Sequence, residues 1–180
     1  GQFSLSAPVE SYWTVLNAGK METAGLLRWA YDAWVADPLR DATHNSFEPG
    51  DCFLIYPDEK TAENPTSKKS VRLERLAQGV RDVNKLMLME KEIPSLEADV
   101  DAVYANIQYA LRTSRSYLNG SQIAALAAET AAFQEDLDTL TEKYIALKAG
   151  GTDQVESIAI QEGESMELHP GDNAQLHVEF

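Results

Sequence analysis

Two short apolar runs, residues 25–30 and residues 52–56, constrain the fold of this chain most strongly. Neither run alternates polar with apolar positions, and a run of that kind predicts a strand that is covered on both faces, as in parallel sheets flanked by helices. Residues 3–6 alternate with a period of two and predict a further short strand. The sequence therefore predicts an α/β fold with about three parallel strands.

Helical periodicity precedes and follows these strands. Pro8 suits the first turn of a helix that Gly19 ends. Ser70 is the expected N-cap of a helix from Val71 to about Glu92. Gly79 inside that helix costs about 1 kcal/mol relative to alanine, so it predicts close packing of the helix on the sheet. Strands and helices in this order are typical of a β/α repeat.

Residues 94–150 are almost purely helical in pattern, and Asn119-Gly120 is a turn signal within them. This pattern predicts a long antiparallel helical hairpin, with Ser121 as the cap of its second helix. Residues at alternating spacings of three and four form a heptad seam along that helix. The seam comprises Ile123, Leu126, Thr130, Phe133, Leu137, Leu140, Tyr144 and Leu147. Residues 151–180 are expected to form short strands and turns.

The composition excludes several classes of function. The formal net charge of −14 disfavours binding to nucleic acids and to anionic membrane surfaces, which both select basic patches. No stretch approaches eighteen consecutive apolar residues, so no membrane span is expected. Cys52 is the single cysteine, and His44, His169 and His177 are not spaced as metal ligands. We expect no metal and no other cofactor.

Four ordered motifs resemble the C-terminal portion of glycoside hydrolase family 123. They are residues 25–34 with the pattern G-L-L-R-W-A-Y-D-A-W, residues 37–39, residues 50–57 with G-D-C-F-L-I-Y-P, and residues 70–82 with Ser70, Arg72, Glu74 and Gly79. The resemblance covers about residues 2–90. It implies that these residues form the last three strands and the closing helix of a (β/α)8 barrel, a fold that needs eight strands and about 250 residues.

The expected fold is therefore an incomplete (β/α)8-barrel segment over residues 2–93, followed by the helical hairpin over 94–150. Residues 155–160 and 168–178 resemble the opening strands of a bacterial Ig-like module of a cell-surface protein. A complete module needs about 80 to 100 residues, so residues 151–180 are expected to be truncated Ig-like β strands.

The resemblance also implies a chemistry. Family 123 hydrolyses N-acetylgalactosaminides with assistance from the substrate's own acetamido group, and an adjacent Asp-Glu pair serves this reaction. In the family, that pair lies upstream of everything present in this sequence. Asp58-Glu59, the adjacent acidic pair within residues 2–93, follows the last expected strand and is interpreted as a solvated loop pair. We expect this chain to carry no catalytic residue.

The candidate substrate-binding residues are the aromatic and polar side chains at the strand ends, where barrel enzymes place their active sites. Trp29 could stack on the apolar face of a sugar, and the Tyr56 hydroxyl could bond a sugar or its acetamido carbonyl. Burial in a core or packing within a loop is the alternative interpretation of each. The full set is Trp29, Tyr31, Asp32, Trp34 and Tyr56.

Other polar residues near these motifs are expected to be structural. Arg28 and Asp51 flank apolar runs and are predicted to form a buried pair. Arg72 is expected to be structural, as is Glu74, and Cys52 is expected to be a small buried side chain.

Two functions remain open from the sequence. The first is a fragment of a secreted, cell-surface or periplasmic bacterial glycoside hydrolase that acts on glycans containing N-acetylhexosamine. The alternative is a non-catalytic spacer or protein-docking module of a cell-surface protein. Open sheet edges would also predict self-association of the chain.

Overall fold

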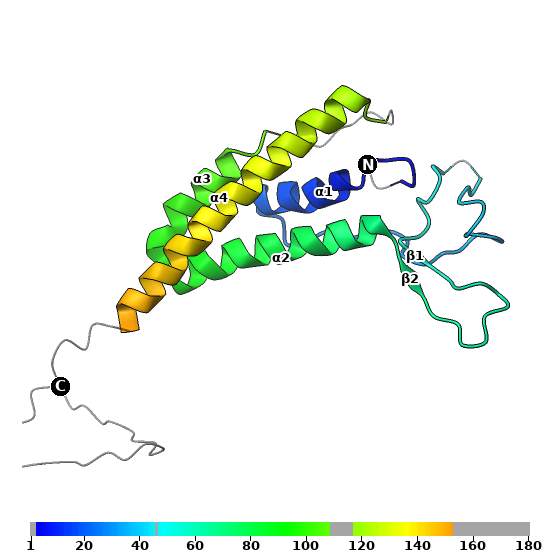
Figure 1. Cartoon of the computed structure of the whole chain (residues 1–180), viewed down its shortest axis with the longest axis horizontal. Helices are drawn as coiled ribbons and strands as arrows, with labels where there is room; N and C mark the ends of the chain where they lie inside the picture. Colours follow the sequence, from blue (N-terminus) through cyan, green and yellow to red (C-terminus); the bar gives the residue numbers. More distant parts are fainter. Residues whose placement is uncertain (1–2, 46, 109–116, 153–180) are drawn as a thin grey trace, which may run out of the picture.

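The computed structural model describes residues 3–45, 47–108 and 117–152. In chain order its elements are α1 (Val9–Lys20), β1 (Ile55–Tyr56), β2 (Lys68–Lys69), α2 (Val71–Glu92), the 3₁₀ turn η1 (Pro94–Leu96), α3 (Glu97–Ala105) and α4 (Gly120–Thr152). The helices lie together, and the loops that carry β1 and β2 gather at one end of them (Figure 1). The described chain is therefore mostly helical.

The predicted α/β fold with about three parallel strands is wrong. The sheet of the described residues has two strands, β1 and β2, which pair antiparallel with Ile55 opposite Lys69 and Tyr56 opposite Lys68. Residues 3–6 form turns and bends, and residues 25–30 form no strand. Because these strands are absent from the described residues, the prediction of an incomplete barrel segment over residues 2–93 is wrong as well.

Strand partners explain the difference. In the 52–56 run, Cys52 lies in a turn and Leu54 in a bend, and only Ile55–Tyr56 form a strand. The neighbour of the run is the 31–33 segment, and an isolated bridge joins Asp32 to Phe53 in the antiparallel sense. Leu54 donates its backbone N–H to the Tyr31 carbonyl at 2.8 Å, and Ala33 donates to the Cys52 carbonyl at 3.1 Å. An apolar run predicts an extended backbone, but it does not specify the partner or its direction. Self-association through open strand edges stays a prediction.

The prediction for α2 is confirmed at both ends. The helix runs from Val71 to Glu92, and the Ser70 hydroxyl accepts a hydrogen bond from the Leu73 N–H at 3.2 Å. The predicted packing of Gly79 on a sheet is wrong, because Gly79 faces α1. A Cβ atom at Gly79 would lie 2.8 Å from the Val15 Cβ and 3.0 Å from the Tyr12 carbonyl oxygen. The missing side chain lets α1 and α2 approach closely.

Gly79→Ala is expected to lower the free energy of unfolding by about 1 to 3 kcal/mol, because the added methyl group overpacks the α1–α2 contact. Better helix propensity, worth about 1 kcal/mol, offsets part of this loss. Urea denaturation of the variant measures it. Gly120→Ala is the control, since a Cβ there meets nothing within 4 Å. An unchanged urea midpoint for Gly79→Ala would contradict the close packing.

One hydrophobic core joins α1 to the helices beyond residue 93. Its buried members come from α1, α2, η1, α3 and α4, with Ile107 beside them. Phe133 on α4 makes edge contacts with Tyr12 and Trp13 of α1, at ring-centroid distances of 6.2 Å and 6.0 Å. The Trp13 Nε1–H donates to the Thr130 hydroxyl at 2.8 Å. Helix α4 therefore covers α1 directly.

A polar network spans the same interface. The Tyr12 hydroxyl donates to Asp82 Oδ2 on α2 at 2.7 Å, and Gln134 Nε2 on α4 donates to the same oxygen at 3.0 Å. Burial, followed by the hydrogen bond to Asp82, raises the pKa of the Tyr12 hydroxyl above its ordinary value. The Asp82 carboxylate thus connects side chains of α1, α2 and α4.

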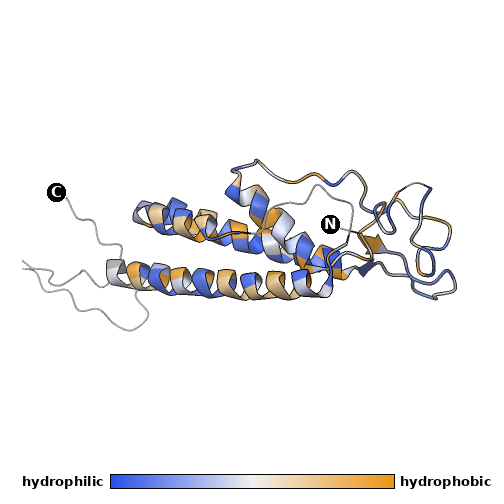
Figure 2. Ribbon diagram, turned by 90° about the horizontal axis from the view of Figure 1, so that it is seen from above, coloured by the Kyte–Doolittle hydropathy of each residue, from blue (hydrophilic) through white to orange (hydrophobic). Residues whose placement is uncertain are grey.

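The predicted long antiparallel hairpin is not what the structure shows, because α3 spans only Glu97–Ala105 whereas α4 spans Gly120–Thr152. Asn119 caps α4 instead of Ser121, because its Oδ1 accepts from the Gln122 N–H and the Gln122 Oε1 accepts from the Asn119 N–H, both at 3.0 Å. Hydrophobic and hydrophilic residues alternate along the helices (Figure 2). The seam is buried at Leu126, Phe133, Leu137 and Leu140 and exposed at Ile123 and Leu147.

The predicted Ig-like strands of residues 151–180 lie outside the described residues, except that residues 151–152 end α4. The division into three domains stays a prediction. Among the helices that the structure describes, none combines the length and the apolar composition needed to cross a membrane.

Candidate functional site

The predicted substrate-binding residues lie on two segments, 28–34 and 51–56, that run beside each other at the loop end of the molecule. The backbone bonds between Tyr31 and Leu54 and between Ala33 and Cys52 fix the register of the two segments. Cys52, Phe53 and Leu54 are buried, so the second segment is the rigid support for the first. The site is thus a surface built on a buried strand-like segment.

Trp29 is exposed and held by its indole N–H. The residue is 56% exposed, so it is not a core tryptophan. Its Nε1–H donates to Asp51 Oδ2 at 3.3 Å. Asp51 Oδ1 also pairs with Arg28 Nη2 at 2.7 Å, and both of these charged side chains are largely buried. The predicted Arg28–Asp51 pair is confirmed, and its carboxylate accepts the hydrogen bond that holds the Trp29 indole.

Phe47 and His44 join this group, and the sequence interpretation missed both. The Phe47 ring stacks on the Trp29 ring, with centroids 5.1 Å apart and planes 28° apart. The His44 ring lies 5.8 Å from Phe47 in a tilted arrangement. A sequence signal existed, since Phe47 shortly precedes the Gly50-Asp51 motif, but a single aromatic residue in a loop predicts no specific contact.

Tyr31, Asp32 and Trp34 continue along the first segment. All three side chains are exposed. The Trp34 Nε1–H donates to the Ile55 carbonyl at 2.7 Å, which fixes the indole against β1 while the residue stays 46% exposed. Asp32 pairs with Phe53 through its backbone, which leaves its carboxylate available to a ligand. These residues therefore present an aromatic and acidic edge to solvent.

Tyr56 lies at the end of the second segment and is half-buried. Its ring packs edge-on against Phe53, with centroids 5.0 Å apart. Arg72 Nη2 donates to the Tyr56 hydroxyl at 3.4 Å. The same guanidinium donates to the Gly50 carbonyl at 2.7 Å and to the Phe53 carbonyl at 3.0 Å. Burial lowers the pKa of Arg72 from its ordinary value, and the residue is structural, as predicted.

Gly50 is required for this arrangement. Its φ of +77° lies in the left-handed region, and a Cβ atom there would lie 2.2 Å from the Ser4 hydroxyl and 3.0 Å from Arg72 Nη1 and Nη2. The turn at Gly50 brings Asp51 beneath Trp29 and the Gly50 carbonyl onto Arg72.

The structure thus gathers the five predicted residues along one pair of segments but does not merge their rings into one cluster. Within the described residues, the ring contacts of Trp29 go to Phe47 and those of Tyr56 go to Phe53, and no ring contact links Trp29, Trp34 and Tyr56. The two tryptophans are held separately, each through its N–H.

Asp58 and Glu59 are held in ion pairs on the loop after β1. Lys68 Nζ lies 2.9 Å from Asp58 Oδ1, and Arg40 Nη2 lies 3.0 Å from Glu59 Oε1. The Lys68 ammonium, together with the Glu59 and Thr66 backbone N–H groups, lowers the pKa of Asp58 to about 2. A carboxyl group of that pKa is ionised at neutral pH and cannot donate a proton as a general acid.

Cys52 and His44 offer no alternative chemistry in the part of the chain that the structure describes. Cys52 is buried, as predicted, and burial raises the pKa of its thiol, so it is a poor nucleophile. Among the residues that the structure describes, no three His, Cys, Asp or Glu side chains form a group that could hold a metal ion. His169 and His177 lie outside the described residues.

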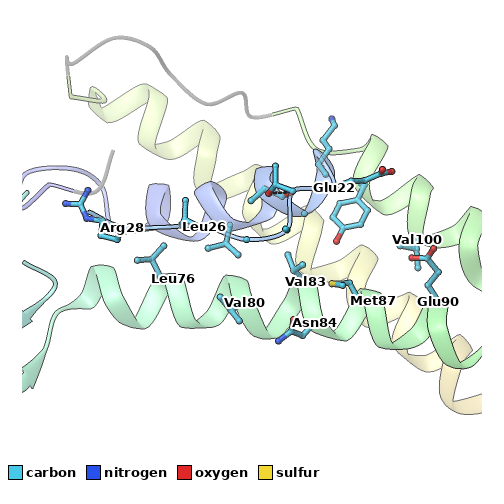
Figure 3. Close-up of a pocket in the computed structure, with 18 of the residues that line it drawn as sticks. Glu22, Leu26, Arg28, Leu76, Val80, Val83, Asn84, Met87, Glu90 and Val100 are labelled. Carbon is cyan, nitrogen blue, oxygen red and sulfur yellow. Dashed lines mark hydrogen bonds between the residues drawn. The ribbon is translucent and has the colours of Figure 1, made fainter. Parts of the chain in front are cut away.

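A cavity of about 830 Å³ lies behind the site, between α1, α2, α3 and the chain that follows α1. Figure 3 shows Leu26, Leu76, Val80 and Val83 along it, with Arg28 near one end and Glu90 near the other. Its lining is mainly aliphatic, and of the predicted site residues Tyr31 alone reaches it. Charged and polar side chains such as Lys20, Glu22 and Asn84 also line it, but the predicted aromatic residues other than Tyr31 lie outside it. The candidate sugar site is therefore the aromatic surface.

The comparisons with known proteins agree with the motifs. The model of the glycoside hydrolase 123 catalytic domain matches residues 1–89. A solved structure of a family 123 glycoside hydrolase from Clostridium perfringens, described in a study of glycolipid glycan hydrolysis, superposes with a TM-score of 0.75 at 27% identity. No curated protein matches this chain.

This similarity covers 83% of this chain and 26% of the Clostridium perfringens chain. It therefore reaches beyond the 89 residues that the family model matches, while this chain spans about a quarter of the length of that relative. Residues 1–89 match a region of the catalytic domain of glycoside hydrolase family 123, and the chain as a whole is similar in structure to part of an enzyme of that family. The resemblance stated from the sequence motifs is confirmed.

Proposed function

We propose that this chain supplies a sugar-binding surface of a family 123 hydrolase acting on glycans that contain N-acetylhexosamine, and that it does not supply the catalytic carboxylate pair. The observation that carries the proposal is the state of Trp29 and Trp34. Both indoles are exposed to solvent, yet each is fixed through its N–H, to Asp51 and to the Ile55 carbonyl. Tryptophans that only stabilise a core are buried, whereas a fixed exposed indole suits a ligand.

The chemistry of these residues matches a sugar. An indole offers a rigid apolar face to the C–H face of a pyranose and loses little conformational entropy on binding. The exposed Asp32 carboxylate can accept hydrogen bonds from hydroxyl groups. Tyr56 can donate its hydroxyl proton to an acetamido carbonyl while its oxygen accepts from Arg72. An acetamido group and hydroxyls on one face are the features of an N-acetylhexosamine.

The acids of this site do not form the adjacent Asp-Glu pair that the reaction uses, since Asp32 stands between Tyr31 and Ala33 and the other acids are held in ion pairs. Asp51 is paired with Arg28, Asp58 with Lys68 on β2, and Glu59 with Arg40. The lowered pKa of Asp58 in particular supports a structural role. Hydrolysis by this chain is therefore not expected.

The test is to titrate the full chain with methyl N-acetyl-β-galactosaminide and to assay it with an aryl N-acetyl-β-galactosaminide. We expect saturable binding without turnover. Trp29→Ala and Trp34→Ala should each weaken binding by about tenfold or more, the cost of losing a stacking aromatic of roughly 1.4 kcal/mol. Leu27→Ala is the matched control, because Leu27 lies on the same segment and is 93% exposed.

Two outcomes would count against the proposal. Turnover of the aryl glycoside would show that a catalytic pair is present in this chain. Absence of binding to N-acetylhexosamines, together with capture of a defined protein partner, would favour the spacer or docking module. The packing of α4 on α1 does not favour that alternative, because the helices share one core with the family-matching half.

The same proposal places the protein where such glycans occur, as a secreted, cell-surface or periplasmic bacterial protein. Its support is the glycan substrate class that the family implies. Detection of the chain in fractionated cells and medium tests this location, and a purely cytoplasmic signal would contradict it.

A further inference from the structure

Trp29 is held on two sides by residues to which no role in binding was assigned from the sequence. Phe47 stacks on one face of the indole, with ring centroids 5.1 Å apart, and Asp51 Oδ2 accepts the indole N–H at 3.3 Å. A stack and a hydrogen bond at the ring edge together restrict both rotations of the side chain. The remaining face of the indole is the surface that a ligand can reach, since the residue is 56% exposed.

Phe47 and Asp51 are each held in place by a further residue. Asp51 is paired with Arg28 through Oδ1 at 2.7 Å and is largely buried, so its position does not depend on Trp29. Phe47 contacts the His44 ring at 5.8 Å, and the Phe47 N–H donates to the His44 carbonyl at 3.0 Å. The rings of His44, Phe47 and Trp29 are therefore in consecutive contact, with Phe47 between the other two.

Packing alone gives Phe47 little reason to lie there. The residue is 44% exposed and belongs to neither hydrophobic core cluster. An exposed phenylalanine stacked on an exposed tryptophan contributes little to folding, but it covers one face of the indole and orients the other. This arrangement fits a single pyranose ring that stacks by its apolar C–H face.

We propose that Phe47 and Asp51 are positioning residues that hold the Trp29 indole so that its free face binds one pyranose ring of the glycan. The inference rests on the proposed function and extends it, because it names which face of which aromatic residue binds the sugar and what keeps it there. Neither residue needs to touch the sugar.

The experiment measures the Kd of the full chain for methyl N-acetyl-β-galactosaminide by quenching of tryptophan fluorescence. Phe47→Ala and Asp51→Asn are each expected to raise Kd by about 2- to 10-fold, the range for loss of one aromatic contact or one hydrogen bond. Phe47→Tyr keeps the ring and should restore Kd to within about twofold of the wild-type value. Leu27→Ala is again the control.

A second readout separates positioning from folding. The thermal midpoint of Phe47→Ala should stay close to that of the wild type, while the near-ultraviolet circular dichroism of the tryptophans should weaken because Trp29 gains mobility. Unchanged Kd in Phe47→Ala and Asp51→Asn, with binding lost in Trp29→Ala, would overturn this inference and leave the proposed function intact. Unchanged Kd in Trp29→Ala as well would overturn both.

Discussion

Phe133→Ala is expected to lower the free energy of unfolding by about 3 to 5 kcal/mol, the cost of removing a buried aromatic side chain. Phe133 is buried on α4 and contacts both Tyr12 and Trp13 on α1. The loss would leave a cavity at the interface between the family-matching half and the helices beyond residue 93. Chemical denaturation followed by far-ultraviolet circular dichroism measures it.

The control for this variant comes from the same helix. Leu147 belongs to the same heptad seam but is 44% exposed, so Leu147→Ala should change the stability by less than about 0.5 kcal/mol. If both variants had the same small effect, or if two separate unfolding transitions were seen in the wild type, α4 and α1 would not share one cooperative core.

Arg72→Met is expected to cost about 3 kcal/mol of stability and to weaken sugar binding. The buried guanidinium donates to the Gly50 and Phe53 carbonyls, and methionine fills the space but leaves both acceptors without these donors. The segment that carries Asp51 and Tyr56 would then lose its attachment to α2. Denaturant unfolding gives the stability loss, and titration with methyl N-acetyl-β-galactosaminide gives the change in binding.

Two further variants sharpen this result. Arg72→Lys keeps the charge but not the forked donor geometry, so it should recover only part of the loss. Arg75→Met, one helical turn further along α2, removes an exposed arginine that bonds to Gln78 and should be nearly neutral. Equal stability and equal binding of Arg72→Met and Arg75→Met would show that the guanidinium does not organise the site.

The sequence predicted the local features that depend on neighbouring residues. Ser70 begins α2 because its hydroxyl caps the Leu73 N–H, and Gly79 marks a close contact because glycine is costly in a helix. The prediction of parallel strands was wrong because strand pairing depends on a partner elsewhere in the chain. The 52–54 run found its neighbour in residues 31–33, in the antiparallel direction.

The candidate site shows the same division. The sequence motifs predicted the Arg28–Asp51 pair that the structure contains. They also singled out Trp29, Trp34 and Tyr56 as candidate binding residues, and that assignment stays a prediction. Phe47 could not be identified from the sequence, because its stacking on Trp29 depends on how the loop before Gly50 folds back. Whether Gly79 packs on a sheet or on α1 likewise depends on tertiary structure, which periodicity does not encode.

The most direct test of the central claim follows the indole N–H signals of the three tryptophans in a ¹H–¹⁵N spectrum during titration with methyl N-acetyl-β-galactosaminide. Trp13 is fully buried in the helical core, whereas Trp29 and Trp34 are exposed at the candidate site. We predict that the Trp29 and Trp34 signals move with saturation and that the Trp13 signal does not. Signals of Trp29 and Trp34 that stay in place throughout the titration would contradict the assignment of a sugar-binding surface to this chain.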